Sequence, residues 1–209
     1  MSDKLYQNNY RIPSARATWH DYNGGAYFIT VCTKNRECYF GEITNVPVEM
    51  HRDMSLQATI QLSPIGQLLH ENLQNATVHY PYAEIPLFVV MPNHWHAIVI
   101  IDGDKIPAKI CRDVTCHVST NPKMRNIRNQ QGFLSTVIGG IKATVTKYAN
   151  ENNIEFAWQT RFYDRIVRHQ NMMNTVADYI ENNVVRWDRD CFNEKNVTAN
   201  INAFYPTYL

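Results

Sequence analysis

The 209-residue chain has no apolar run close to the roughly 20 residues that a membrane-spanning helix needs. Its beginning, MSDKLYQNNYRIPSAR, is polar and lacks the apolar core of a signal peptide. The cysteines are odd in number, five, and form no CxxC pair, which is typical of reduced thiols and disfavours a zinc site built on cysteine. We therefore expect a soluble cytoplasmic protein.

Net charge is also small, +1 at pH 7, and by itself gives no reason to expect a nucleic-acid partner. The charges are unevenly distributed, however. The stretch 105–147 holds eight basic residues and one acidic residue, and Arg161, Arg165 and Arg168 follow with a single Asp164. A one-sided basic surface on a near-neutral chain is typical of proteins that bind a phosphate backbone. A solvated loop explains the first cluster equally well, so both interpretations stay open.

The hydrophobic pattern predicts one α+β domain. Strands are predicted at 26–33, 85–91, 95–101 and within 156–167, a small hairpin at 46–62, and helices at 63–76, 133–150 and 171–187. With the hairpin set aside, the order β-α-β-β-α-β is the ferredoxin-like, split β-α-β arrangement, an antiparallel sheet with helices on one face. The last predicted helix follows this unit.

The chain divides into three parts on this interpretation. Residues 1–22 read as a polar N-terminal arm, residues 23–187 as a single catalytic domain, and residues 188–209 as a C-terminal tail. Within the domain, an insert loop at about 102–131 has no periodicity and carries Gly, Pro, Asn and much of the positive charge.

Two histidines interrupt the most apolar run of the chain, FVVMPNHWHAIVII at 88–101. His94 and His96 are two residues apart, so on an extended strand their imidazoles leave the same face and Trp95 leaves the other. Two neutral imidazoles that converge on one face form half of a divalent-metal site, which then needs a further oxygen or nitrogen ligand. A hydrogen-bonded histidine pair without a metal explains the spacing equally well.

The last predicted helix offers what such a metal site lacks. Tyr179 and Asn183 are four residues apart and are expected to lie on one helical face. Their phenol and carboxamide would supply a nucleophile and an oxygen ligand. Spacing alone does not exclude the other phenols, those of Tyr80, Tyr148 and Tyr163.

Five fragments carry a resemblance to a known family. They are, in order, AYFITVCTKNRECYFG, FVVMPNHWHAIVII, GGIKATVTK, WQTRFYDRIVR and NTVADYIENNVVRWDRD, and they span most of the chain. Together they resemble the single-tyrosine transposases of the IS200/IS605 type, which carry a His-hydrophobic-His (HUH) motif. The fuller pattern is similar to their domesticated branch, the REP-associated tyrosine transposases.

This resemblance implies a function and a set of site residues. His94, His96 and Asn183 would be ligands of a divalent metal, Mg²⁺ or Mn²⁺, and Tyr179 the nucleophile. The activity implied is cleavage and transfer of single-stranded DNA through a 5′-phosphotyrosine, on hairpin DNA of the REP type. Family members more often have Asn-Pro where this chain has Asn183-Val184, and without proline the helix is free to run on.

The implied partner is single-stranded or hairpin DNA, and the protein would be a monomer or homodimer associated with a bacterial nucleoid, with no membrane partner. The candidate DNA-binding residues are Arg11, Arg16, Lys142, Lys147, Arg161 and Arg165. Two other functions fit the same sequence: a catalytically silent protein that binds DNA hairpins, and a metal-dependent hydrolase that uses water as its nucleophile.

Overall fold

The computed structural model describes residues 24–50, 53–106, 132–193 and 196. The predicted arm with Arg11 and Arg16, most of the predicted insert loop and most of the predicted tail lie outside the described residues.

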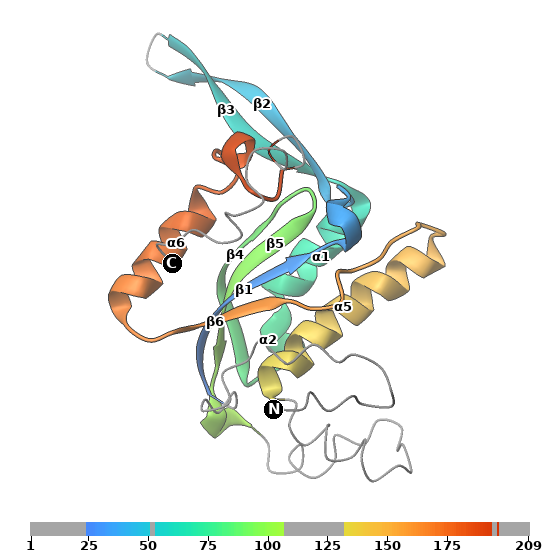
Figure 1. Cartoon of the computed structure of the whole chain (residues 1–209), viewed down its shortest axis with the longest axis vertical. Coiled ribbons are helices and arrows are strands. Elements are labelled where there is room, and N and C mark those ends of the chain that lie inside the picture. The colour runs from blue at the N-terminus through green and yellow to red at the C-terminus, as the bar shows by residue number, and fades with distance from the viewer. Residues whose placement is uncertain (1–23, 51–52, 107–131, 194–195, 197–209) are drawn as a thin grey trace, which may run out of the picture.

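A four-stranded antiparallel sheet with the order β4-β5-β1-β6 forms the centre of the molecule (Figure 1). β1 (Gly25–Cys32) pairs with β5 (His94–Ile101) on one side and with β6 (Tyr163–Val167) on the other. β4 (Ala83–Val90) pairs with the free side of β5. This is the strand order of a ferredoxin-like sheet, so the predicted fold class is confirmed and the histidines lie on an interior strand.

Two helices cover one face of this sheet. Ser63 begins α1 (Pro64–Gln74) as predicted, because its hydroxyl accepts a hydrogen bond from the Gly66 amide at 3.1 Å. α5 (Phe133–Glu151) lies beside α1, and a short α2 (Ala76–His79) follows α1 (Figure 1). The core between these helices and the sheet includes Leu69, Leu73, Leu134, Val137 and Ile138 from the helices and Tyr27, Ile29, Val31 and Trp95 from the strands.

A third helix, α6 (Gln170–Glu181), packs on the opposite face of the sheet, where Val176 and Ile180 contact Phe28 and Ile98. Side chains alternate along β5, so Trp95 points toward α1 and α5 while the two histidines point to the face of α6. The predicted direction of the histidines is therefore confirmed.

The helix predicted at 171–187 is shorter in the structure, since α6 ends at Glu181. The Asn182 side chain donates to the Asp178 carbonyl at 2.8 Å and caps the helix end. A turn follows, and then a short 3₁₀ helix, η3 (Trp187–Arg189). Asn183 therefore lies in the turn just beyond the helix that carries Tyr179, and its side chain still hydrogen-bonds that of Tyr179.

The predicted hairpin is present as a separate two-stranded ladder, β2 (Gly41–Met50) with β3 (Asp53–Leu62), that projects from the body of the molecule (Figure 1). Two further 3₁₀ turns, η1 (Lys34–Arg36) and η2 (Gly103–Lys105), follow β1 and β5. None of the helices in the described part of the chain is long and apolar enough to span a membrane.

Candidate active site

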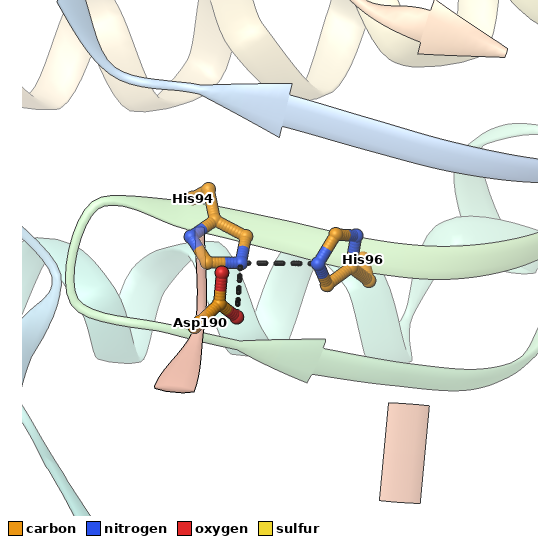
Figure 2. Close-up of side chains that lie close together, drawn as sticks. All are labelled: His94, His96 and Asp190. Carbon is orange, nitrogen blue, oxygen red and sulfur yellow. Dashed lines mark hydrogen bonds and ion pairs between the residues drawn. The ribbon is translucent and has the colours of Figure 1, made fainter. Parts of the chain in front are cut away.

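The two histidines meet at the start of β5, next to the bend that joins it to β4. The Nε2 atoms of His94 and His96 lie 3.0 Å apart, and both side chains are buried (Figure 2). The Met91 amide donates to the His94 carbonyl at 2.8 Å and closes the bend. The bend and the central strand thus fix both rings in one place.

Asn93 orients His94. Its amide nitrogen donates to two carbonyl oxygens, those of Arg36 at 2.9 Å and Phe192 at 2.8 Å. Its oxygen therefore faces Nδ1 of His94, at 2.8 Å, and accepts that proton. The tautomer that follows places the lone pair of His94 on Nε2, the nitrogen that faces His96.

His96 is held from β1. Its Nδ1 lies 2.8 Å from the hydroxyl of Thr30, its partner across the strands, and the Phe28 ring stacks on it at 5.3 Å. Burial lowers the pKa of His96 to about 3. Burial, followed by the charges of His96 and Arg36, lowers the pKa of His94 well below its ordinary value. Both imidazoles are neutral at pH 7, which is the form that binds metals.

Tyr179 reaches this pair from α6. Its hydroxyl lies 3.3 Å from Nε2 of His96, and the edge of its ring meets Phe28. Burial, with smaller contributions from the charges of Asp190 and Cys191, raises the pKa of Tyr179, so the phenol is neutral at physiological pH. Spacing left four phenols as candidates. Two of them, Tyr80 and Tyr148, pack on the opposite side of the sheet.

Asn183 completes the cluster. Its side chain is 1% exposed and hydrogen-bonds both Tyr179 and Asp190, which lowers the pKa of each of those groups. Its Oδ1 atom is buried without a hydrogen-bond partner within the described residues. A buried acceptor left unsatisfied costs about 1–3 kcal/mol. An amide oxygen in that state is suited to a cation.

Asp190 is a site residue that the sequence did not reveal. Its Oδ2 lies 4.0 Å from Nε2 of His94 (Figure 2), and the ligand atoms of His94, His96 and Asp190 all lie within 4.8 Å of one another. Burial raises the pKa of the Asp190 carboxyl. Two signals pointed to its segment: Asp190 ends the fragment NTVADYIENNVVRWDRD, and the apolar pair Cys191-Phe192 follows it in a polar tail.

These donors fit a divalent metal. Two imidazole nitrogens bound to one zinc-sized ion at about 2.0–2.1 Å stand roughly 2.9–3.4 Å apart. The observed separation of the two Nε2 atoms, 3.0 Å, matches this spacing and is also that of a hydrogen bond between the two rings. The amide and carboxylate oxygens of Asn183 and Asp190 add ligands of the kind that Mg²⁺ and Mn²⁺ prefer, while imidazole suits Mn²⁺ better than Mg²⁺. The buried group His94-His96-Asp190 can therefore bind a metal.

The candidate DNA-binding residues are divided between the two sides of the sheet. Arg165 lies on β6 opposite Phe28, and paired residues share a face, so it belongs to the histidine side, and Arg161 precedes β6. Lys142 and Lys147 lie on α5, on the other side. Lys142 donates to the Gln159 carbonyl at 2.9 Å, and Lys147 lies 3.7 Å from Glu151.

Sequence comparison with known proteins identifies a relative of this chain. No family model matches the chain. An uncharacterized protein of Haemophilus influenzae is 31% identical over 196 residues, which cover 91% of this chain and 97% of that protein.

Two solved structures resemble the chain. One is the REP-associated tyrosine transposase bound to a REP hairpin, with 19% identity, coverage of 93% of this chain and 89% of that chain, and a TM-score of 0.46. The other is a putative transposase from Deinococcus radiodurans R1, with 10% identity, coverage of 82% and 97%, and a TM-score of 0.34.

Proposed function

The chain belongs to the same family as the Haemophilus influenzae protein, and we propose that it is a metal-dependent tyrosine nuclease and strand transferase that acts on single-stranded DNA next to a hairpin. One observation carries the proposal: the half-buried phenol of Tyr179 lies 3.3 Å from Nε2 of His96, one of two buried, neutral imidazoles. The five sequence fragments that resemble the single-tyrosine transposases support the same assignment.

A metal at this site would be held by His94, His96 and Asn183, with the Asp190 carboxylate as a further donor. When bound, Mg²⁺ or Mn²⁺ would neutralise the charge that develops on a non-bridging phosphate oxygen and polarise the phosphorus. Burial of the two imidazoles keeps them neutral, so no proton has to leave them before the ion binds.

The chemistry of this chain is then a displacement by Tyr179. Its phenol oxygen attacks the phosphorus in line, a Tyr-O–P bond forms, and the P–O3′ bond of the DNA breaks. The phenol releases its proton to water, and the departing 3′ oxygen takes up a proton. The products are a 5′-phosphotyrosine and a free 3′-OH, and attack by another 3′-OH reverses the step without ATP.

The direct test uses hairpin oligonucleotides with single-stranded flanks from the DNA around the gene, labelled at either end and incubated with Mn²⁺ or Mg²⁺. A denaturing protein gel detects a covalent adduct. We expect an adduct that carries the 3′ portion of the DNA, absent from Tyr179→Phe and His96→Ala. Tyr148→Phe is the matched control, since Tyr148 lies on the opposite side of the sheet, and should form the adduct normally.

Two outcomes would reject the proposal in favour of its rivals. Binding of the hairpin without any adduct from the wild-type protein would indicate a protein that binds DNA and has no chemistry. Cleavage that persists in Tyr179→Phe without an adduct would indicate a hydrolase that uses water.

A further inference from the structure

A cavity of ≈ 570 Å³ opens beside the active site, lined by the end of β1, by η1 and by residues 158–164, which are hydrogen-bonded to the end of β1. It shares two residues with the site. Thr30 lines the cavity and also hydrogen-bonds His96, and Phe192 lines it while its ring lies 4.5 Å from the ring of His94. The cavity thus lies directly next to the place where the phosphate is proposed to react, with Thr30 and Phe192 in contact with both.

The position of the cavity follows from the way the sheet is covered. α6 packs over β4 and β5 on the histidine face, where Val176 and Ile180 form an apolar cluster with Leu87 and Val89. The cavity lies on the other half of the same face, over β1 and the start of β6. Thr30 pairs with Tyr163 there, and both side chains line the cavity.

The charge of the lining is largely positive. Lys34, Arg36 and Arg161 line the cavity, against one acidic residue, Asp164. Lys34 and Arg161 are exposed, while Arg36 donates to the Cys191 carbonyl at 2.7 Å. The cavity next to the proposed metal ligands is therefore lined by three cations and one carboxylate.

Two further features of the lining are typical of a nucleic-acid site. The lining includes the aromatic residues Trp158 and Tyr163, and cations combined with aromatic rings are how proteins hold unpaired nucleotides. η1 also places Asn35 (φ 56°) and Arg36 (φ 61°) in the left-handed region, which is unfavourable for residues other than glycine and is concentrated at functional sites.

We propose that this cavity binds the nucleotide directly next to the scissile phosphate, with its phosphate between Lys34 and Arg161 and its base inside. This inference rests on the proposed function and deepens it. A cavity of a few hundred Å³ encloses one small ligand, so the base must leave any stack or pair to enter. The bond that is cleaved must then lie in unpaired DNA, outside the hairpin stem.

The test is photo-crosslinking with the full-length Tyr179→Phe protein, Mn²⁺ and a hairpin oligonucleotide with a single-stranded flank. 5-Iodouracil is placed at one flank position at a time. The cleavage position in the same DNA is determined separately with the wild-type protein. We expect the position next to the cut to crosslink to peptides that contain residues 158–165. Crosslinks from that position only to α5 or to the β2–β3 hairpin, or none at all, would overturn the inference.

The same scan separates this inference from the proposed function. Cleavage by the wild-type protein without a crosslink to residues 158–165 would reject the assignment of the cavity and leave the proposed chemistry intact. A crosslink from a single flank position to these residues, without any cleavage, keeps the cavity as a nucleotide site and rejects the chemistry. The absence of both results overturns the two proposals together.

Affinity measurements provide a second readout. Arg161→Ala and Lys34→Ala should each weaken binding of the flanked hairpin about 5-fold. Each should also reduce the slope of log K against log salt concentration by about one, because one phosphate contact is lost. Binding of the same hairpin without its flank should not change. Arg186→Ala is the matched control, because Arg186 lies outside the cavity lining and contacts Asp178 on the surface at 3.5 Å. An equal loss for both DNAs would place the two cations on the stem and contradict the inference.

Discussion

The phenol oxygen of Tyr179 lies 3.3 Å from Nε2 of His96, although 83 positions separate the two residues along the chain. Packing of α6 produces this contact. Val176 and Ile180 are buried against Phe28 and Ile98, which lie on the same face of the sheet as the histidines. The apolar contacts of one helix thus place a potential nucleophile beside two potential metal ligands.

Asn93 should control metal affinity without contacting the metal. Asn93→Ala removes the acceptor for Nδ1 of His94 and both donors that hold the Phe192 and Arg36 carbonyls. Loss of such a supporting contact typically reduces metal affinity about 10–100-fold, which isothermal titration with Mn²⁺ measures.

Asn93→Asp is the matched variant, because it keeps the acceptor for His94 and loses only the donors. Its Mn²⁺ affinity should lie clearly above that of Asn93→Ala. If both variants bind Mn²⁺ as the wild-type protein does, Asn93 does not set the tautomer of His94.

The fold could be predicted because its signals are local. Alternation along the strands placed Trp95 on one face and the histidines on the other, and the Ser63-Pro64 pair marked the start of α1. Asp190 could not be predicted in this way. Its segment has no periodicity, and it is held by contacts that are distant in sequence, from Asn93 to the Phe192 carbonyl and from Arg36 to the Cys191 carbonyl.

The basic residues also could not be placed from the sequence. Lys142 lies on α5 and its amine donates to the Gln159 carbonyl, whereas Arg161, two residues beyond Gln159, is exposed and lines the cavity. The spacing of basic residues along the sequence follows neither the helix nor the strand period, so it does not show on which face of the sheet they lie. The end of α6 was missed for a related reason, since an asparagine side chain rather than a proline or glycine caps it.

Asn183 should link metal binding to stability. A ligand that binds only the folded state at 100 times its dissociation constant stabilises it by about 2.7 kcal/mol, so Mn²⁺ should raise the melting temperature of the wild-type protein. In Asn183→Leu the buried Oδ1 is absent, and we expect a much smaller rise.

Asn183→Asp restores an oxygen and should restore most of the Mn²⁺-dependent rise in melting temperature. A full rise in Asn183→Leu would show that this oxygen is not a metal ligand. Melting curves recorded with EDTA provide the reference for each variant.

Acid should destabilise the metal-free protein through its buried histidines. The pKa of His96 is about 3 in the folded state and about 6.5 in an unfolded chain, so below pH 6.5 only the unfolded chain takes up this proton. The free energy of unfolding should therefore fall as pH decreases from 6.5 toward 3, by about 1.4 kcal/mol per pH unit from this residue.

The raised pKa of Asp190 acts in the opposite direction, so the effect of His96 is measured as a difference. The free energy of unfolding in urea is measured at pH 5 and pH 6.5 with EDTA, for the wild-type protein and for His96→Leu. The difference between the two proteins in the pH-dependent change is the contribution of His96. The variant should lose less stability across this range than the wild-type protein. Equal losses would mean that His96 is accessible to protons in the folded state.

The most direct measurement of the central claim is the location of the covalent bond. The wild-type adduct with hairpin DNA is digested with nuclease and trypsin, and mass spectrometry identifies the modified peptide. The account predicts a 5′-phosphonucleotide on Tyr179, in the peptide of residues 169–186. A nucleotide on any other residue, or cleaved DNA with an unmodified Tyr179, would contradict it.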